Sequence, residues 1–483
     1  MMFDLAAGLI AFGHVTIFLV VTLRILSRHN PPGIAMAWLL AVLLFPLVGP
    51  LTYFAIGERR LGHAGFARSL ALRPKLRRWL ESLIANMAAP PGVAGPQAEP
   101  VARLAAALTD IPVLRGNRLK LLSDSDEILR SLASDIDTAH DFAHLEFYIW
   151  NEGGLVNEVI QALCRAAQRG VRVRAMVDGM GSAPFLKSDS VVRLRAAGVE
   201  VIEVLPIGAV RFFAVRTDLR DHRKIAVFDN RVAYTGSLNL VDPKFFKQDA
   251  GVGEWVDAVA RIEGPACCVL DAISTSMAHM QPGLREPVQP QLPAEAASHG
   301  GTATVQVFPS GPGYAYHHVE SLMMEAVYAA QRELVLTTPY FVPGDALVGA
   351  LRSAALRGVR VTLILPEKND SKLVQYASES YFDELLAAGV KVQRFRGGLL
   401  HTKSLVIDGA FAVFGTANLD RRSFLLNFEV SLLVYDAGFA GDLLKLYQNY
   451  LADSVPLDPT TWAARPARHR IAENAAALAA PLL

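Results

Sequence analysis

The stretch HRKIAVFDNRVAYTGSLNL (222–240) returns later in the chain as HTKSLVIDGAFAVFGTANL (401–419). In both copies a lysine stands two residues after a histidine, an aspartate follows, and a glycine-containing turn leads to an asparagine. The offset between the copies is the same at all four of these residues. Such agreement indicates an internal duplication rather than two chance motifs.

Other matching segments surround the two motifs in the same order. RGVRVRAMVD (169–178) corresponds to RGVRVTLILP (357–366), and LRAAGVEV (194–201) corresponds to LLAAGVKV (385–392). A helix-like stretch precedes each RG pair, whose glycine stands where a helix C-cap glycine belongs, and a β-branched run follows. Alternating helices and buried strands predict an α/β fold in which two duplicated domains pack as a pseudo-dimer.

The composition limits the class of protein. A chain of 483 residues is too long for one ordinary core, so two or three domains are expected. Hydrophobic residues make up 52% and charged residues 19%, which is apolar for a soluble enzyme but too polar for a chain built wholly of membrane spans. The net charge of +1 gives no overall attraction to nucleic acid. The three cysteines cannot form a disulfide framework, and no Cys/His spacing resembles a zinc site.

Two apolar runs open the chain, at residues 5–23 and 34–56, with a short polar turn between them. Each is long enough to cross a hydrocarbon core of about 30 Å as a helix. Residues 1–60 are therefore predicted to form a transmembrane helical hairpin. A secretory signal peptide and a hairpin in a protein core are the competing interpretations; the first is disfavoured because no basic segment precedes the first run.

Basic residues gather after the second run, against two arginines in the turn. The positive-inside rule predicts that everything after residue 57 faces the cytoplasm. The same cations could attract anionic lipid headgroups. These residues are Arg59, Arg60, Arg68, Arg73, Lys75, Arg77 and Arg78.

Two stretches rich in proline, glycine and small residues, 88–100 and 284–302, read as linkers. They divide the chain after the hairpin into a basic juxtamembrane segment with its linker (61–100), a first domain (101–283), a second linker (284–302), a second domain (303–455) and a C-terminal tail (456–483).

The histidine and lysine of each motif form a candidate phosphate site. If each motif is a strand, His222 and Lys224 share one face, and His401 and Lys403 do the same. An imidazole can attack phosphorus or move protons, while an ammonium stabilises charge on oxygen. Each motif asparagine follows a glycine-containing turn and could donate an amide hydrogen bond to a phosphate oxygen; these are Asn239 and Asn418.

A nucleophilic imidazole needs a partner that holds its other nitrogen. A carboxylate opens an apolar, strand-like run after each motif, and we expect Asp257 to orient His222 and Glu429 to orient His401. The last residues of the motifs point to the opposite face of the predicted strands and are expected to brace the fold; they are Asp229 and Asp408.

The two motifs resemble the HKD signatures of the phospholipase D superfamily. The segments YFAIGERR (53–60), LEFYIWN (145–151), TTPYFVP (337–343) and HTKSLVIDGAFAVFGTANLDRRS (401–423) extend the resemblance to bacterial cardiolipin synthases over nearly the whole chain. That family converts two phosphatidylglycerol molecules into cardiolipin and glycerol without metal or another cofactor. It works at the bacterial cytoplasmic (inner) membrane, so the resemblance implies a multi-pass membrane enzyme.

The resemblance also implies roles for the residues of this chain. His222 is the expected nucleophile, which forms a phosphatidyl-histidine intermediate, and His401 is the expected acid and base. Two departures from the family's pattern are small: Asp221 stands where asparagine is common, and Thr416 where serine is usual. The phosphate would be held by Lys224, Lys403, Asn239 and Asn418, and the HKD set is completed by Asp229 and Asp408.

Other functions stay open at this stage. A phospholipase D hydrolase, or a transferase that uses a small alcohol, would share the same motifs and first half-reaction. A nucleic acid partner is not expected, because the basic cluster lies beside the apolar runs and is not interleaved with aromatics near the motifs. A membrane scaffold without activity is disfavoured by the intact motifs. The DxxDGxxAR motif of the CDP-diacylglycerol-dependent chemistry is absent from the sequence.

Overall fold

The computed structural model describes residues 2–27, 32–57, 78–79, 81–82, 87–206, 216, 218–281, 301–314 and 317–478. Most of the predicted basic segment and of the second linker, and the terminal PLL, lie outside these residues. The chain divides into two compact units, one of Met1–Phe66 with Ile207–Leu219 and one of Ala67–Pro206 with Arg220–Leu483.

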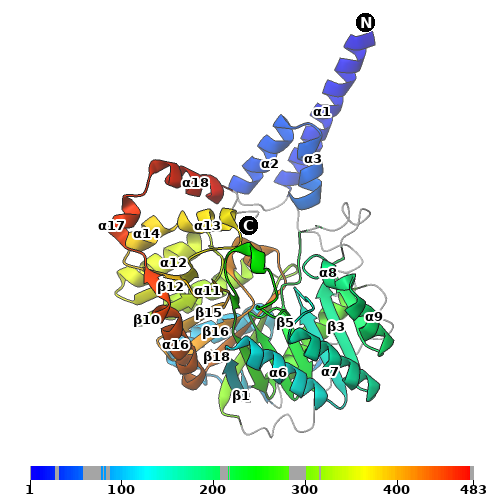
Figure 1. Ribbon diagram of the computed structural model, residues 1–483. Coiled ribbons are helices and arrows are strands. Elements are labelled where there is room, and N and C mark those ends of the chain that lie inside the picture. The colour runs from blue at the N-terminus through cyan, green and yellow to red at the C-terminus, as the bar shows by residue number, and fades with distance from the viewer. Residues whose placement is uncertain are drawn as a thin grey trace. The chain divides into compact units, whose positions relative to one another are not determined.

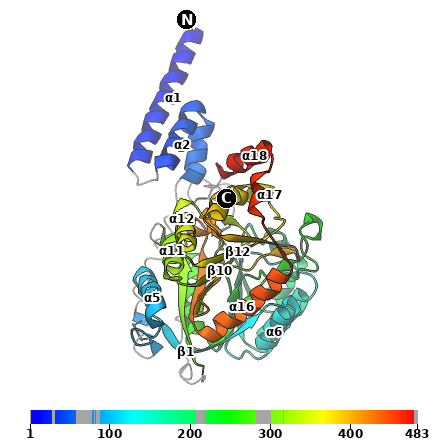
Figure 2. The same cartoon turned by 90° about the vertical axis from the view of Figure 1, so that its left-hand side faces the viewer.

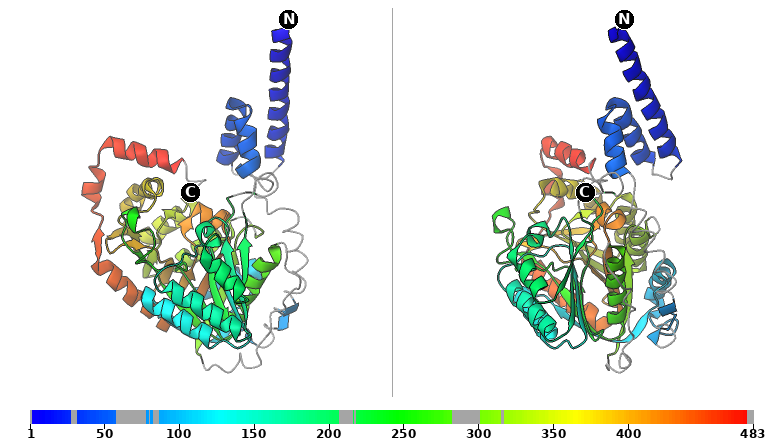
Figure 3. Two further views of the ribbon diagram at one scale, coloured as in Figure 1. Left: turned by 45° about the vertical axis from the view of Figure 1, so that its right-hand side comes forward. Right: turned by 90° about the vertical axis from the view of Figure 1, so that its right-hand side faces the viewer.

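The smaller unit is a helical hairpin. It contains α1 (Met2–Leu26), α2 (Pro32–Leu44), α3 (Val48–Thr52) and a π-helical turn (Tyr53–Gly57), and α1 and α2 run side by side (Figure 3). Its apolar contact is formed by Val21, Ile25, Val42 and Tyr53, and the Trp38 ring meets the Tyr53 ring edge-on at 5.4 Å.

The second apolar run does not form the single helix that its length predicts. The helix α2 ends at Leu44, shortly before Pro46, because proline cannot donate the backbone hydrogen bond that a helix interior requires. Among the helices of the described part, none is both long enough and apolar enough to cross a membrane. The helical hairpin is thus present, and its crossing of a membrane stays a prediction.

The larger unit is built on one sheet, which has fifteen strands in the part of the chain that the structure describes. The first half of the chain supplies β1 (Leu114–Leu122), β2 (Phe142–Phe147), β3 (Arg172–Asp178), β4 (Glu200–Val204), β5 (Lys224–Phe228), β6 (Val232–Gly236) and β8 (Val259–Glu263). The second half supplies β9 (Ala303–Ser310), β10 (Glu333–Thr337), β12 (Arg360–Pro366), β13 (Lys391–Phe395), β15 (Ser404–Ile407), β16 (Phe411–Gly415), β18 (Glu429–Tyr435) and β19 (Ser454–Pro456).

The strand order confirms the duplication. The first half runs β1-β8-β6-β5-β2-β3-β4 and the second runs β9-β18-β16-β15-β10-β12-β13, with β19 added at its edge. In both halves the motif strand lies between an antiparallel hairpin partner and a parallel set of strands. Antiparallel pairing of β1 with β9, which places Leu114 opposite Val305, joins the halves into one sheet.

Helices cover the outer side of each half. The helix α7 shows why: Val156, Val159, Ile160 and Leu163 recur at helical spacing and are buried. Figure 1 shows the first-half helices along one side and the second-half helices along the other. They are α6 (Ser125–Asp137), α7 (Val156–Gln168), α8 (Ala183–Leu186) and α9 (Asp189–Ala196), and α11 (His318–Ala329), α12 (Asp345–Leu356), α13 (Lys372–Glu379) and α14 (Phe382–Ala387).

Two long helices, one from each half, pack on the sheet and share one core. The helix α10 (Ala266–Met280) packs on β2, β5 and β8. The helix α16 (Ala437–Ala452) packs on β15, β16 and β1 and crosses the front of Figure 2. The core between the halves takes side chains from both motif strands, among them Ile225, Val227 and Val406. The two halves are therefore held together by a continuous apolar core.

Two predicted boundaries are wrong in detail. Residues 95–100, expected in a linker, begin α5 (Gly95–Thr109), which packs beside α11 in the core of the second half (Figure 2). Burial of Ala98, Val101 and Ala105 favours the helix despite Pro100. The expected C-terminal tail belongs to the second half: it forms β19, α17 (Pro459–Ala463) and α18 (Ala467–Ala477), which contact β13, α14 and α13.

The motif aspartates lie at the far ends of their strands, where each binds a neighbouring backbone turn. Asp229 accepts hydrogen bonds from the backbone N–H groups of His140, Asp141 and Phe142 at 2.7–2.9 Å. Asp408 does the same for residues 331–333 in the other half. Each carboxylate therefore ties the end of the motif strand to the start of its antiparallel neighbour, β2 in the first half and β10 in the second.

Replacing Asp229 by alanine is expected to lower the free energy of unfolding by about 1–3 kcal/mol, because three backbone donors lose their acceptor. Thermal unfolding measures the change. Asp229→Asn is the control: its amide oxygen still accepts, and asparagine tolerates the left-handed backbone at this position (φ 52°), so a smaller loss is expected. An alanine variant as stable as the parent chain would contradict the bracing role.

Candidate active site

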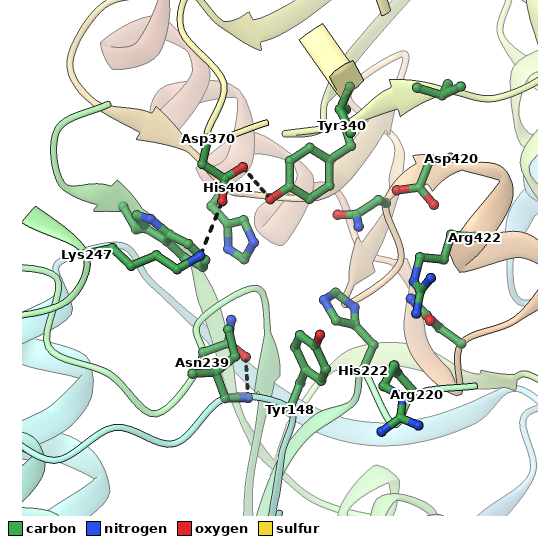
Figure 4. A pocket seen from close by; sticks show the side chains of 16 residues that line it. Tyr148, Arg220, His222, Asn239, Lys247, Tyr340, Asp370, His401, Asp420 and Arg422 are labelled. Carbon is green, nitrogen blue, oxygen red and sulfur yellow. Dashed lines mark hydrogen bonds and ion pairs between the residues drawn. The ribbon is translucent and has the colours of Figure 1, made fainter. Parts of the chain in front are cut away.

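One cavity of about 340 Å³ brings together the histidine and asparagine side chains of both motifs. The rings of His222 and His401 face it from opposite sides (Figure 4). Its other lining residues are Tyr148, Ile149, Arg220, Asn239, Lys247, Trp255, Tyr340, Val342, Asp370, Val374, Asn418, Asp420, Arg422 and Asn427.

The histidines stand just before their strands, which corrects the expectation that each whole motif is a strand. The strand β5 begins at Lys224 and β15 at Ser404. Each histidine is instead held by the other half of the chain: His222 N–H donates to the Phe428 carbonyl at 2.9 Å, and His401 N–H donates to the Val256 carbonyl at 2.8 Å. The short strands β7 (Trp255–Val256) and β14 (Leu399–Leu400) pair at the second of these contacts.

The carboxylates pair with the histidines across the two halves, so the pairing expected from the sequence is wrong. His222 Nδ1 lies 2.9 Å from both carboxylate oxygens of Glu429, and His401 Nδ1 lies 2.7 Å from Asp257 Oδ1. Glu429 directly follows Phe428 and Asp257 directly follows Val256, the two residues that hold the histidine backbones. The crossed backbone contacts thus bring each carboxylate to the histidine of the opposite motif.

Burial favours the uncharged form of both imidazoles. It lowers the pKa of His222 well below its usual value, and that of His401 to about 4, with the neighbouring lysines acting in the same direction. Burial also raises the pKa of Glu429 to about 7. Burial opposes the charged form of Asp257, but the contacts with His401 and the nearby Lys403 outweigh it and lower the Asp257 pKa. A neutral imidazole that gives Nδ1–H to a carboxylate leaves Nε2 free to attack or to accept a proton.

Each motif lysine is buried and contacts the backbone of its motif histidine. Lys224 Nζ donates to the His222 carbonyl at 2.7 Å, and Lys403 Nζ donates to the His401 carbonyl at 2.5 Å. Burial lowers the pKa of Lys224 to about 8 and that of Lys403 to about 7. A bound anion would restore the charge on both ammonium groups, since an opposite charge favours the protonated form.

The motif asparagines supply amide groups at the same cavity. Asn239 Oδ1 accepts from the Ile149 backbone N–H at 3.1 Å, which leaves its amide nitrogen toward the cavity (Figure 4). The buried Asn418 Oδ1 has no hydrogen-bond partner within the described residues. Both side chains are therefore placed to meet a polar group in the cavity.

Several cavity residues were not predicted as site residues. The Tyr148 ring lies 5.0 Å from the His222 ring, and the Trp255 ring lies 4.5 Å from the His401 ring. Tyr148 and Tyr340 lie in the segments LEFYIWN and TTPYFVP. The resemblance of these segments to the family could have identified both tyrosines as site residues. Arg422 likewise lies in the quoted segment 401–423. Nothing local in the sequence signals Trp255, Arg220, Lys247 or Asp370.

The unusual Asp221 belongs to a buried cluster of charges beside His222. Its backbone N–H and the Arg220 guanidinium both donate to Asp178, at 3.0 and 3.2 Å. Burial and then the negative charge of Glu146 raise the pKa of Asp221 well above its usual value. This favours a neutral carboxyl group, which can donate a hydrogen bond as the amide of asparagine does.

Within the described residues, no group of three or more His, Cys, Asp and Glu side chains is placed to hold a metal ion. Metal-free catalysis remains an expectation from the family resemblance.

Two duplicated α/β halves that share one cavity, with a His-Lys pair and an asparagine from each, define a phospholipase D-type protein. The family model described as "Cardiolipin synthase, PLD-like domain" matches residues 132–251 and 323–452, and the one described as "Phospholipase D-nuclease N-terminal" matches residues 15–58. The chain belongs to the phospholipase D-like cardiolipin synthase family.

Individual relatives agree with this assignment. The chain is 43% identical to cardiolipin synthase A of Edwardsiella ictaluri and 42% identical to cardiolipin synthase A of Yersinia pseudotuberculosis, covering 100% of this chain and 99% of each relative. Among solved structures, a phosphatidylserine synthase of Haemophilus influenzae shares the fold, with a TM-score of 0.60 at 16% identity over 80% of this chain and 100% of that one.

Replacing Glu429 by glutamine is expected to lower the rate of product formation by about 100-fold, because His222 loses the carboxylate that fixes its tautomer. Thr416→Ser is the matched control, since a serine hydroxyl can still donate to Glu429 as that of Thr416 does at 2.6 Å. The check is the steady-state rate per folded protein. A Glu429→Gln variant with the parental rate would contradict the crossed pairing as a working part of the site.

Proposed function

We propose that this chain transfers a phosphatidyl group from one phosphatidylglycerol molecule to another and so produces cardiolipin and glycerol. The observation that carries the proposal is the single cavity that two oppositely held imidazoles face, each with its Nδ1 on a buried carboxylate. One phosphorus atom between the rings could be attacked from one side while its leaving group is protonated from the other. The identity with cardiolipin synthases over the full length supports the choice of substrate.

In the first half-reaction, His222 Nε2 attacks the phosphorus of the donor lipid. The bond from phosphorus to the glycerol headgroup breaks, and His401 gives the departing oxygen a proton. Burial lowers the His401 pKa, and an anionic phosphate beside the ring raises it, so His401 takes up a proton from water as the substrate binds. A phosphatidyl-histidine remains, with its phosphate oxygens bound by Lys224 and Lys403 and by Asn239 and Asn418.

In the second half-reaction, His401 accepts the proton of a terminal hydroxyl on a second phosphatidylglycerol. That oxygen attacks phosphorus, the phosphorus–nitrogen bond breaks, and His222 is restored. One phosphodiester replaces another, so no energy source is required. Water would compete for the intermediate, and the buried histidines, lysines and carboxylates favour a site from which water is largely excluded.

The N-terminal unit is proposed to hold the enzyme in the bacterial cytoplasmic membrane as a multi-pass hairpin, with both catalytic halves in the cytoplasm. The observation behind this is a set of large apolar side chains on its surface. Phe12 and Leu47 are each 72% exposed, and Leu23, Leu26 and Leu44 are also exposed. Lipid chains would cover such residues, and both lipid substrates would be concentrated at the same surface.

A hydrolase or a small-alcohol transferase is the alternative function, because the phosphatidyl-enzyme is common to all three reactions. Only the group that attacks the intermediate differs. Phosphatidic acid as the main product from pure phosphatidylglycerol would favour the alternative.

Expression in a bacterium that lacks cardiolipin synthase tests the proposal. The washed membranes are expected to contain the chain after alkaline carbonate extraction and to convert phosphatidylglycerol into equal amounts of cardiolipin and glycerol.

His222→Ala and His401→Ala are expected to lower the rate of cardiolipin formation by about 1,000-fold or more. Mass spectrometry is expected to find the phosphatidyl adduct on His222. A soluble chain, an adduct on His401, or undiminished activity in either variant would each contradict one part of the proposal.

The alkaline limb of the pH profile follows from the lysines. An ammonium is charged below its pKa, so both lysines are charged well below pH 7 and lose their charge as pH rises through about 7 for Lys403 and about 8 for Lys224. We expect kcat/KM for phosphatidylglycerol to fall across this range. Lys403→Arg keeps its charge throughout and is expected to flatten the limb if it remains active. An unchanged decline in an active arginine variant would assign the limb to another group.

A further inference from the structure

Lys247 reaches across the mouth of the cavity from the first half to the second. Its ammonium lies 3.6 Å from Asp370 Oδ2, and the other oxygen of Asp370 accepts a hydrogen bond from the Tyr340 hydroxyl at 2.9 Å (Figure 4). The same ammonium lies 5.4 Å from the centre of the Trp255 ring and 5.6 Å from that of Phe246. Lys247 is thus held over the cavity without belonging to either HKD motif.

The ion pair between Lys247 and Asp370 can open to a ligand. Its 3.6 Å separation exceeds the distance of about 2.7–2.9 Å typical of charge-assisted hydrogen bonds. The Lys247 side chain is 45% exposed, so water weakens the attraction further. An anion with several acceptor oxygens can therefore bind the Lys247 ammonium in place of Asp370. The hydrogen bond from Tyr340 to Asp370 remains.

The proposed reaction involves two phosphates, and the HKD groups account for one of them. The acceptor phosphatidylglycerol has its own phosphate, five bonds from the terminal hydroxyl that attacks. Single bonds in an extended chain advance about 1.2 Å each, so this phosphorus lies about 6 Å from the attacking oxygen. A second anion site is therefore needed within that reach of the histidine that deprotonates the hydroxyl.

Lys247 lies on the correct side of the cavity for this second phosphate. The Trp255 ring lies 4.5 Å from the His401 ring and 5.4 Å from the Lys247 ammonium, so the ammonium is no farther than about 10 Å from the imidazole centre. An acceptor whose hydroxyl binds at His401 Nε2 would place its phosphorus about 6 Å farther on. A contact between this phosphate and the ammonium would complete the distance from His401 to Lys247. The two arginines of the cavity, Arg220 and Arg422, stand nearer His222 (Figure 4).

We propose that Lys247 binds the phosphate of the acceptor lipid and thereby selects a phosphate-bearing alcohol over a neutral alcohol or water. The inference rests on the proposed function, in which His401 activates the acceptor. Lys247 acts on the choice of acceptor and takes no part in forming the phosphatidyl-enzyme.

The test is a competition between acceptors. The full-length enzyme is given phosphatidylglycerol vesicles with ethanol, and cardiolipin, phosphatidylethanol and phosphatidic acid are quantified together. Lys247→Met keeps an apolar stem over Trp255 but removes the charge, and we expect the ratio of cardiolipin to phosphatidylethanol to fall about tenfold or more. Lys247→Arg keeps the charge and is expected to retain most of the parental ratio.

Lys244→Met is the matched control. Lys244 lies on the same loop but pairs with Asp126 at 2.9 Å and does not line the cavity, so the product ratio is expected to stay parental. The phosphatidylethanol that Lys247→Met still forms reports that the variant is folded.

The outcomes separate this inference from the proposed function. If Lys247→Met lowers cardiolipin and phosphatidylethanol in the same proportion, or leaves the ratio unchanged, the role in acceptor choice is overturned. If the parent enzyme forms phosphatidylethanol and phosphatidic acid but no cardiolipin from phosphatidylglycerol, the proposed function itself fails.

Discussion

The hydrogen bonds between His222 and Glu429 and between His401 and Asp257 cross from one half of the chain to the other. Neither half therefore contains a complete site, although each contains a complete motif. The crossing depends on the core between the halves, where the motif strands and the helices α10 and α16 are buried together. A change in the packing of this core would separate a ring from its carboxylate. The imidazole would then lose the contact that fixes the tautomer with a reactive Nε2.

Burial determines the charges of the site as well as its geometry. Removal from water lowers the pKa of both histidines and both lysines and raises that of Glu429, so these groups favour their uncharged forms more than they would in water. An incoming phosphate would restore the positive charge of the histidines and lysines because it offers the opposite sign in a medium of low polarity. The same exclusion of water favours a lipid hydroxyl over hydrolysis in the proposed reaction. Burial thus accounts both for the shifted pKa values and for the preference for a lipid hydroxyl over water.

Much of the fold was predictable because it repeats over short distances along the chain. The stretches before Gly170 and Gly358 form α7 and α12, and both glycines adopt the positive φ of a helix C-cap. One prediction failed because of a local residue, and another failed because distant contacts outweigh the local pattern. Pro46 interrupts the second apolar run, and residues 95–100 become helical because Ala98 and Val101 are buried in the second half. The apolar composition predicted one long helix where the chain forms a shorter one. The proline- and glycine-rich composition predicted a linker where the chain forms the start of α5.

The sequence by itself determined the duplication, the α/β class, and the histidines, lysines and asparagines that carry the chemistry, because residue type and spacing repeat in both halves. Only the tertiary structure decided which carboxylate holds which histidine, since this depends on the backbone contacts of Phe428 with His222 and of Val256 with His401. It also brought Lys247 to Asp370 at the cavity mouth. Such pairs lie more than a hundred residues apart, and no local periodicity records them; they form because a shared apolar core packs one half against the other.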